Sequence, residues 1–180
     1  MIMKMPASNL LVWVGDKNAW IRISGRASFN SSVDFKTLIN NLAQKGFSRF
    51  VLDLTECPLM DSTFLGVLAG LGLKFGARRN GDPQPSLELL NPNPRILDLL
   101  DNLGVAHLFK VLKEPPEFAR ADMAPVDPAP TNADRREVSR TCLEAHKTLM
   151  DVNPANISKF KEVAEFLAND LKKTEGNGEK

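Results

Sequence analysis

Short apolar runs separated by polar turns recur through the first two thirds of the chain and predict strands. Residues 10–15 are rich in β-forming side chains, and residues 19–25 alternate apolar and polar positions, so together they predict a β-hairpin. Residues 49–55 form a nearly unbroken apolar run, as in a strand covered on both faces. Residues 85–91 and 107–113 are two further predicted strands. These runs predict a sheet of four to five strands.

Between the runs, apolar side chains recur three and four residues apart, as on one face of a helix. This pattern predicts helices over residues 31–46, 62–75 and 95–104, with Ser31 or Ser32 as the N-cap of the first. Because strands then alternate with helices, we expect an α/β fold with right-handed crossovers and a mixed, largely parallel sheet. Three helices barely cover one side of such a sheet, so they are expected mainly on one face.

The pattern changes after residue 113. Residues 114–130 hold five prolines, which predicts a semi-extended linker with little capacity for helix or sheet. Residues 133–151 and 153–173 each carry an apolar stripe amid charges and predict a hairpin of two amphipathic helices. Their stripes must be buried against each other, the main domain or another chain. The expected divisions are a domain at 1–113, a linker at 114–130, a helical hairpin extension at 131–174 and a disordered tail at 175–180.

Composition and charge narrow the classes of function. The chain has 180 residues, of which 43% are hydrophobic and 25% charged, as in an ordinary globular protein. The formal net charge of +1 gives no reason to expect nucleic acid or an anionic membrane as a partner. No apolar run approaches the roughly 18 residues of a spanning helix. The N-terminus lacks the charged start and cleavage site of a signal peptide, so we expect a cytoplasmic protein.

Side chains suited to catalysis or metal binding are few. Cys57 and Cys142 lie far apart in the sequence without metal-type spacing and are expected to be reduced thiols. His107 and His146 are the only histidines, and the lack of co-ligands favours surface or half-buried positions over ligation. The motifs of phosphate loops, zinc proteases and α/β-hydrolases are absent from the sequence. No metal, no cofactor and no enzymatic activity are therefore expected.

The segment CPLMDSTFLGVLAGLGLKF, residues 57–75, places three small polar residues between two apolar runs. Asp61, Ser62 and Thr63 suit the N-cap of the helix that follows, which is a purely structural explanation. Glycine weakens helices, so its recurrence in this helix indicates a requirement for small side chains. The positions are Gly66, Gly70 and Gly72. Close packing on the sheet is the expected reason, and a flat face for docking a partner is the alternative.

The element order and the segment RFVLDLTECPLMDSTFLGVLAGL resemble the STAS domain, the fold of bacterial anti-sigma factor antagonists. The resemblance covers roughly residues 8–113 and leaves out the linker and the hairpin. It rests on an apolar strand, a short loop, Asp61-Ser62, and Leu65-Gly66 in this order. Asp-Ser alone would not be specific. Members of the family usually have glycine where this chain has Phe64.

This resemblance implies a binding module in a partner-switching signalling pathway that regulates transcription. In the family, a serine kinase that is also the anti-sigma factor phosphorylates the serine after the aspartate, and a PP2C-type phosphatase removes the phosphate. Carried over, Ser62 is the phosphoacceptor, with Thr63 as the alternative. The partner-binding residues are Asp61, Ser62, Thr63, Phe64 and Gly66. The positive end of a helix dipole would tolerate the phosphate, whose charge would repel an acidic partner.

The residues leave several alternatives open. Phe64 is expected to fill the core, and otherwise it would anchor a partner. The alternative to a phosphorylated switch is a non-phosphorylated STAS scaffold, with homo-oligomerisation through the C-terminal helices. A Ser-dependent hydrolase would need a base beside Ser62, and His107 or His146 would have to supply it. A structure with neither histidine near Ser62 would end that hypothesis.

Overall fold

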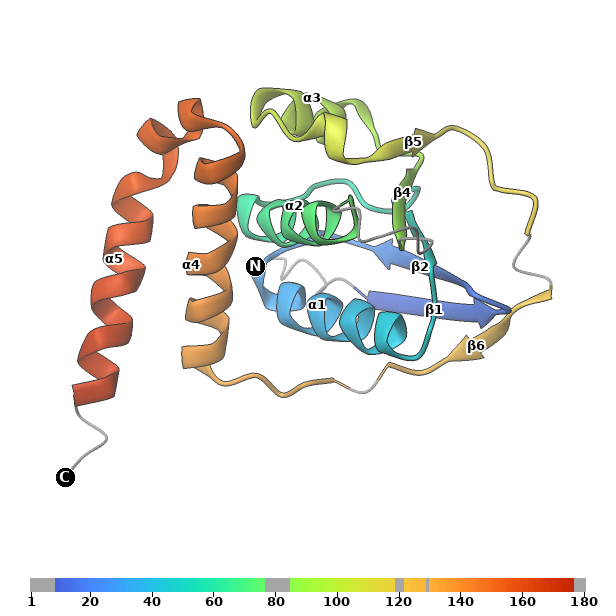
Figure 1. The fold of residues 1–180 in the computed structure, drawn as a ribbon, viewed down its shortest axis with the longest axis horizontal. Helices are drawn as coiled ribbons and strands as arrows, with labels where there is room; N and C mark the ends of the chain where they lie inside the picture. The colour runs from blue at the N-terminus through green and yellow to red at the C-terminus, as the bar shows by residue number, and fades with distance from the viewer. Residues whose placement is uncertain (1–8, 77–84, 119–121, 129, 177–180) are drawn as a thin grey trace, which may run out of the picture.

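The computed structural model describes residues 9–76, 85–118, 122–128 and 130–176, which fold around one mixed six-stranded sheet (Figure 1). The strands are β1 (Asn9–Gly15), β2 (Asn18–Ser24), β3 (Arg49–Asp53), β4 (Ser86–Leu90), β5 (Lys110–Leu112) and β6 (Ala124–Val126). Their order in the sheet is β5-β4-β3-β2-β1-β6. β2 to β5 run parallel, whereas β1 is antiparallel to both of its neighbours.

β1 and β2 form the predicted hairpin. Their register pairs Asn9 with Ser24 and Gly15 with Asn18, so the chain reverses direction in a tight turn. Asp16 lies in that turn with φ of 52°, a conformation that aspartate tolerates better than most residues. From β2 to β5, successive strands are joined by crossovers through helices, as the alternating pattern requires. The α/β fold with a mixed, largely parallel sheet is confirmed.

Five α-helices in the described residues complete the fold. They are α1 (Phe29–Gln44), α2 (Ser62–Gly76), α3 (Pro94–Asn102), α4 (Arg135–Val152) and α5 (Ile157–Gly176), with short 3-10 helices η1 (Ala106–Leu108) and η3 (Pro154–Asn156). α1 and α2 lie side by side over the sheet (Figure 1). Apart from Val33, the buried apolar side chains of α1, α2 and α3 belong to one core cluster. The helices of the main domain therefore lie mainly on one face, as predicted.

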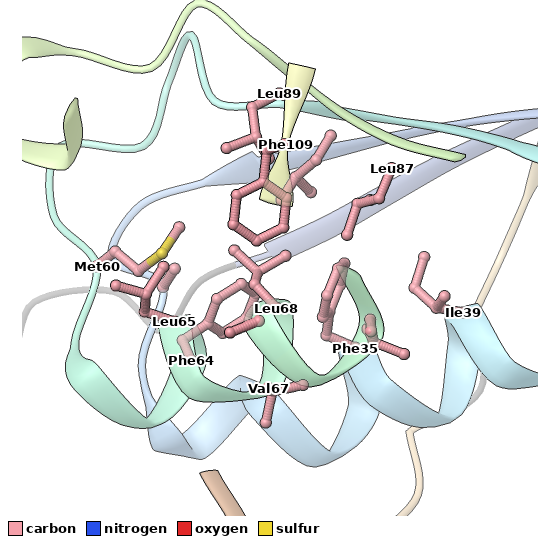
Figure 2. Packing of buried hydrophobic residues seen from close by; sticks show 14 of the residues in the cluster. Phe35, Ile39, Met60, Phe64, Leu65, Val67, Leu68, Leu87, Leu89 and Phe109 are labelled. Atoms are coloured by element: carbon pink, nitrogen blue, oxygen red, sulfur yellow. The ribbon is translucent and has the colours of Figure 1, made fainter. Parts of the chain in front are cut away.

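The main core fills the space between the sheet and α1 and α2, and Figure 2 shows its centre. Phe64, Leu65 and Leu68 of α2 are each 0% exposed. Phe64 lies beside Phe35 of α1, Leu65 lies beside Met60, and Leu68 points toward the side chains of β4 (Figure 2). Phe35 of α1 packs directly on Phe64, with ring centroids 4.9 Å apart. This apolar packing fixes α2, and with it the segment around Ser62, against the sheet.

The opposite face of the sheet carries a smaller cluster made of Trp20, Val51 and Leu90. The proline-rich segment after β5 covers it, because Phe118 and Met123 pack there. The guanidinium of Arg49 lies 4.7 Å from the centroid of the Phe118 ring, a cation–π contact. The segment predicted as a linker therefore also protects the second face of the sheet.

The same segment supplies β6, an edge strand that the sequence did not predict. β6 pairs antiparallel with β1, and its register sets Pro125 opposite Trp13. Proline is tolerated in an edge strand, because one side of the strand needs no backbone donor. The sheet thus has six strands in the described residues, where four to five were expected.

The C-terminal hairpin packs on the main domain as an additional layer. α4 packs on α2 and also contacts α1, while α5 packs along α4 (Figure 1). Ala145 and Leu149 of α4 are 3% and 0% exposed and belong to the main core. Asn153 caps η3, the turn after α4, and Pro154 is the first residue of that turn. Of the three ways to bury the stripe of α4, the structure shows packing on the main domain and on α5.

Element ends differ in detail from the sequence pattern. The N-cap of α1 is Ser28, and the Ser31 hydroxyl accepts the Ser28 N–H at 3.4 Å, so the helix begins earlier than predicted. β5 begins only at Lys110, after η1. α5 continues to Gly176, so the first residues of the predicted disordered tail are helical.

Parts of the predicted divisions lie outside the described residues, namely 1–8 and 77–84 of the domain, 119–121 and 129 of the linker, and 177–180 of the tail. In the residues that the structure describes, no helix is both long and apolar enough to cross a lipid bilayer.

Candidate functional site

Asp61 ends the loop between β3 and α2 and holds the starts of two helices. Its Oδ1 accepts the N–H of Phe64 at 2.8 Å, which is the N-cap hydrogen bond of α2. Its Oδ2 accepts the N–H of Phe29 at 2.8 Å, at the first residue of α1. Its own N–H donates to the carbonyl of Ala27 at 2.9 Å. The carboxylate thus stabilises two positive helix ends at once.

The Ser62 hydroxyl, at the first residue of α2, does not cap the helix but faces α4. Its Oγ lies 3.0 Å from Nε2 of His146. Nδ1 of the same ring lies 2.7 Å from the carbonyl oxygen of Cys142. A carbonyl can only accept, so Nδ1 carries the hydrogen, and in the neutral ring Nε2 accepts the Ser62 hydroxyl. Ser62, His146 and the Cys142 carbonyl form a short chain of hydrogen bonds between α2 and α4.

Thr63 also faces α4. Its hydroxyl donates to Sγ of Cys142 at 3.6 Å, and the residue is 6% exposed. Burial raises the pKa of the Cys142 thiol, the hydrogen bond from Thr63 lowers it, and the charge of Asp61 raises it, with a net rise. A raised pKa keeps the sulfur in the neutral thiol form at pH 7, so Cys142 packs rather than reacts.

The other two predicted partner-binding residues are covered. Phe64 is 0% exposed and packs on Phe35, so of its two possible roles the structure shows core packing (Figure 2). Gly66 is buried beneath α4, where an added Cβ would lie 2.5 Å from the carbonyl oxygen of Ala145. α4 can approach this closely only because Gly66 has no side chain.

The three glycines of α2 have different neighbours. A Cβ on Gly72 would meet the Phe109 ring at 3.1 Å, beside β5, which is the close packing near the sheet that was expected. Gly66 instead faces a helix, and a Cβ on Gly70 would meet only the Thr148 side chain, at 4.0 Å. The alternative explanation, a flat docking face, therefore fits Gly66, and in this structure α4 occupies that face.

Sequence reasoning missed the role of His146. The residue is 5% exposed, more buried than expected, and its ring lies 5.0 Å from that of Phe160. The signal was its spacing, because His146 follows Cys142 by four residues and precedes Leu149 by three, on the same face of α4. His107 lies in η1, which packs near the C-terminal end of α2, away from Ser62. Among the described residues, no group of His, Cys, Asp and Glu side chains could hold a metal ion.

The fold and the Asp61-Ser62 segment define a STAS domain, and comparison with known families gives the same result. The STAS domain family matches residues 14–117, more than half of the chain. The chain therefore belongs to the STAS domain family. The match ends before β6, so α4 and α5, with His146 and Cys142, lie outside it. Comparison with curated proteins gave no match.

Solved structures similar to this chain include anti-sigma factor antagonists. One is SpoIIAA in its unphosphorylated form, with 18% identity, a TM-score of 0.47, and coverage of 61% of this chain and 90% of that chain. A putative anti-sigma factor antagonist from Thermotoga maritima has 17% identity, a TM-score of 0.47, and coverage of 61% and 86%. Phosphorylated SpoIIAA from Bacillus has 18% identity, a TM-score of 0.43, and coverage of 60% and 93%.

Proposed function

We propose that this chain is the phosphorylatable binding module of a partner-switching signalling pathway, with Ser62 as the phosphoacceptor. Its partner in this proposal is a serine kinase of the anti-sigma type, and a PP2C-type phosphatase resets it. The module itself is not an enzyme. Membership in the STAS family and the Asp61-Ser62 pair at the start of α2 support this proposal.

The observation that carries the proposal is the position of the Ser62 hydroxyl. Ser62 is the first residue of α2, it is half-buried, and Asp61 beside it already caps the helix. A phosphate on Ser62 would face the positive end of the helix dipole, so the modification need not unfold the domain. It would add about −1.5 to −2 of charge next to Asp61. A partner adapted to the neutral hydroxyl would then bind more weakly.

Phosphate mapping tests the proposal. The full chain is incubated with ATP and, in turn, each serine kinase of the anti-sigma type from the same genome, and the phosphate is located by mass spectrometry. We expect phosphate on Ser62, lost in Ser62→Ala and kept in Thr63→Ala. The reverse pattern would identify Thr63 as the phosphoacceptor. Phosphate on neither residue would rule out the phosphorylation switch.

One feature of α5 favours the alternative, a non-phosphorylated scaffold that associates through the hairpin. Phe166 is 69% exposed, and Val163, one turn earlier, is 39% exposed. A second copy of the chain would bury these side chains. Analytical ultracentrifugation of the full chain and of Phe166→Glu decides between the two. An oligomer that is lost in the variant supports the scaffold, whereas a monomer in both cases counts against it.

The 3.0 Å contact between Ser62 and His146 meets the first requirement of a Ser-dependent hydrolase, a base beside the nucleophile. The contact is enclosed, however, because His146 is 5% exposed and packs against Phe160. This leaves little room for a substrate, so we favour the binding module over a hydrolase. Hydrolysis of p-nitrophenyl acetate that disappears in both Ser62→Ala and His146→Ala would favour the hydrolase instead. Equal rates in the unmodified chain and both variants would rule the hydrolase out.

A further inference from the structure

α4 packs on one strip of α2 that consists of small residues. The strip comprises Ser62, Gly66 and Gly70, on three successive turns, and we call it the docking face. Opposite it lie His146, Ala145 and Thr148 of α4. Phe64 and Leu68, which belong to the other side of α2, point into the core instead (Figure 2). The docking face is therefore a second contact surface of the same helix.

The middle of the docking face is shaped to receive the backbone of another helix. A Cβ on Gly66 would lie 2.5 Å from the carbonyl oxygen of Ala145 and 2.7 Å from its carbonyl carbon. Alanine at this position would favour the helix more than glycine does. Glycine at this position therefore weakens α2 but allows another helix to approach closely.

A phosphate on Ser62 is incompatible with α4 in its present position. Nε2 of His146 accepts a hydrogen bond from the Ser62 hydroxyl. Phosphorylation removes that hydroxyl hydrogen, so two hydrogen-bond acceptors would then face each other. The His146 ring is 5% exposed and packs against Phe160, so little room is left beside Nε2 for the added phosphate group. The carboxylate of Asp61, the residue before Ser62, adds to the negative charge. The space for the phosphate is also the space that α4 fills.

Contacts at both ends of α4 would hold the hairpin to the domain even if α4 left the docking face. Asn156, after the end of α4, donates to the carbonyls of Leu103 and Leu149 at 2.9 and 2.8 Å, which fixes the far end of α4 to the domain. Before α4, the Thr131 N–H donates to Asp34 of α1 at 2.8 Å. A released α4 would stay tethered at both ends, so it would compete with any incoming partner at high effective concentration.

We propose that the docking face is the surface to which the kinase partner binds, and that α4 occupies it within the chain, so that hairpin and partner exclude each other. The identity of the partner rests on the proposed function, whereas the exclusion of α4 by charge on Ser62 does not. The partner presents a helix with a small residue opposite Gly66, as α4 does with Ala145. Docking of α4 and phosphorylation of Ser62 then oppose each other reciprocally.

Hydrogen exchange in the full chain tests the exclusion without any kinase. Ser62→Asp places a charge at the site, and Ser62→Asn is the neutral control of the same size. We expect amides of residues 138–146 to exchange about tenfold faster or more in Ser62→Asp than in Ser62→Asn, with β3 equally protected in both. Equal exchange in α4 would overturn the proposal, and so would faster exchange that extends to β3.

A reversible cross-link tests the exclusion of the kinase. Thr63→Cys places a thiol against native Cys142, whose Sγ is 3.6 Å from the Thr63 hydroxyl, so oxidation can tie α4 to α2. Burial raises the pKa of the Cys142 thiol, so oxidation above neutral pH closes the bond more readily. Thr63→Cys combined with Cys142→Ser is the control that cannot close it.

The readout of the cross-linked variant is the rate of Ser62 phosphorylation by the kinase identified through phosphate mapping. We expect the oxidised Thr63→Cys protein to be phosphorylated about tenfold more slowly than the same protein after reduction, with no such difference in the control. Equal rates in the oxidised and reduced protein would overturn the inference while leaving the proposed function intact. If no kinase modifies Ser62, the proposed function fails, and the exchange experiment alone decides whether charge releases α4.

Discussion

Two sides of α2 are buried, and they are built in different ways. Toward the sheet, Phe64, Leu65 and Leu68 are fully enclosed by other apolar side chains (Figure 2). Toward α4, the docking face has no large side chain, and its contacts include one hydrogen bond and one close backbone approach. The first side is stabilised by apolar area, which many atoms share. The second depends on fit and polar pairing, so a single added group can disrupt it.

The largest effect is expected on the sheet side. Phe64→Ala removes a fully buried ring from its contact with Phe35, and such truncations cost about 3–5 kcal/mol of unfolding free energy. Leu73→Ala, in the same helix but 44% exposed, is the control and should change stability by about 0.5 kcal/mol or less. Urea denaturation measures both. Similar values for the two variants would mean that the sheet side of α2 is not the permanent core.

On the other side of α2, Gly66→Ala and Gly70→Ala form a matched pair. Each should gain up to about 1 kcal/mol from helix propensity. At Gly66 the new Cβ would overlap the backbone of Ala145, and overpacking costs about 1–3 kcal/mol, so we expect net destabilisation and displacement of α4. At Gly70 the nearest atoms are 4.0 Å away, so we expect a gain. Thermal unfolding and hydrogen exchange of α4 measure the difference, and two equally stabilised variants would refute the fit.

The sheet side of α2 could be predicted from the sequence, because it depends on local periodicity. The apolar run of residues 49–55 and the helical spacing after Asp61 each require only neighbouring residues. The burial of Phe64 followed from the general tendency of large aromatic side chains.

The docking side could be predicted only in part, because its contacts join distant residues. The glycines indicated a close neighbour without saying which one, and Ser62 and His146 are 84 positions apart in the chain. Asp61 was expected to cap α2, but its second bond reaches Phe29, 32 positions away. β6 escaped prediction because a short edge pairing beside prolines leaves no periodic pattern. Such contacts depend on how helices and strands pack against each other, and local sequence patterns do not give this information.

The smallest expected effect concerns two exposed ion pairs that differ in what they join. Lys36 of α1 and Glu144 of α4 are 2.9 Å apart, with side chains 40% and 55% exposed. Arg136 of α4 and Glu175 of α5 are 2.8 Å apart, with side chains 44% and 57% exposed. The first pair holds α4 to the main domain, whereas the second acts within the hairpin. Glu144→Gln and Glu175→Gln therefore test the attachment of α4 with closely matched changes.

Exposed pairs contribute roughly 0.2–1 kcal/mol, so Glu144→Gln should speed exchange in α4 by about fivefold at most. Glu175→Gln should leave α4 unchanged, because the Glu175 contact stays with the hairpin when α4 leaves α2. In about 1 M salt the two variants should converge, since the charges are then screened over about 3 Å. If they already agree at low salt, the Lys36–Glu144 pair adds nothing to docking. The attachment of α4 to the main domain would then depend on Ala145, Leu149 and the polar contacts at Ser62. A charge on Ser62 would in that case release α4 more effectively than loss of the ion pair.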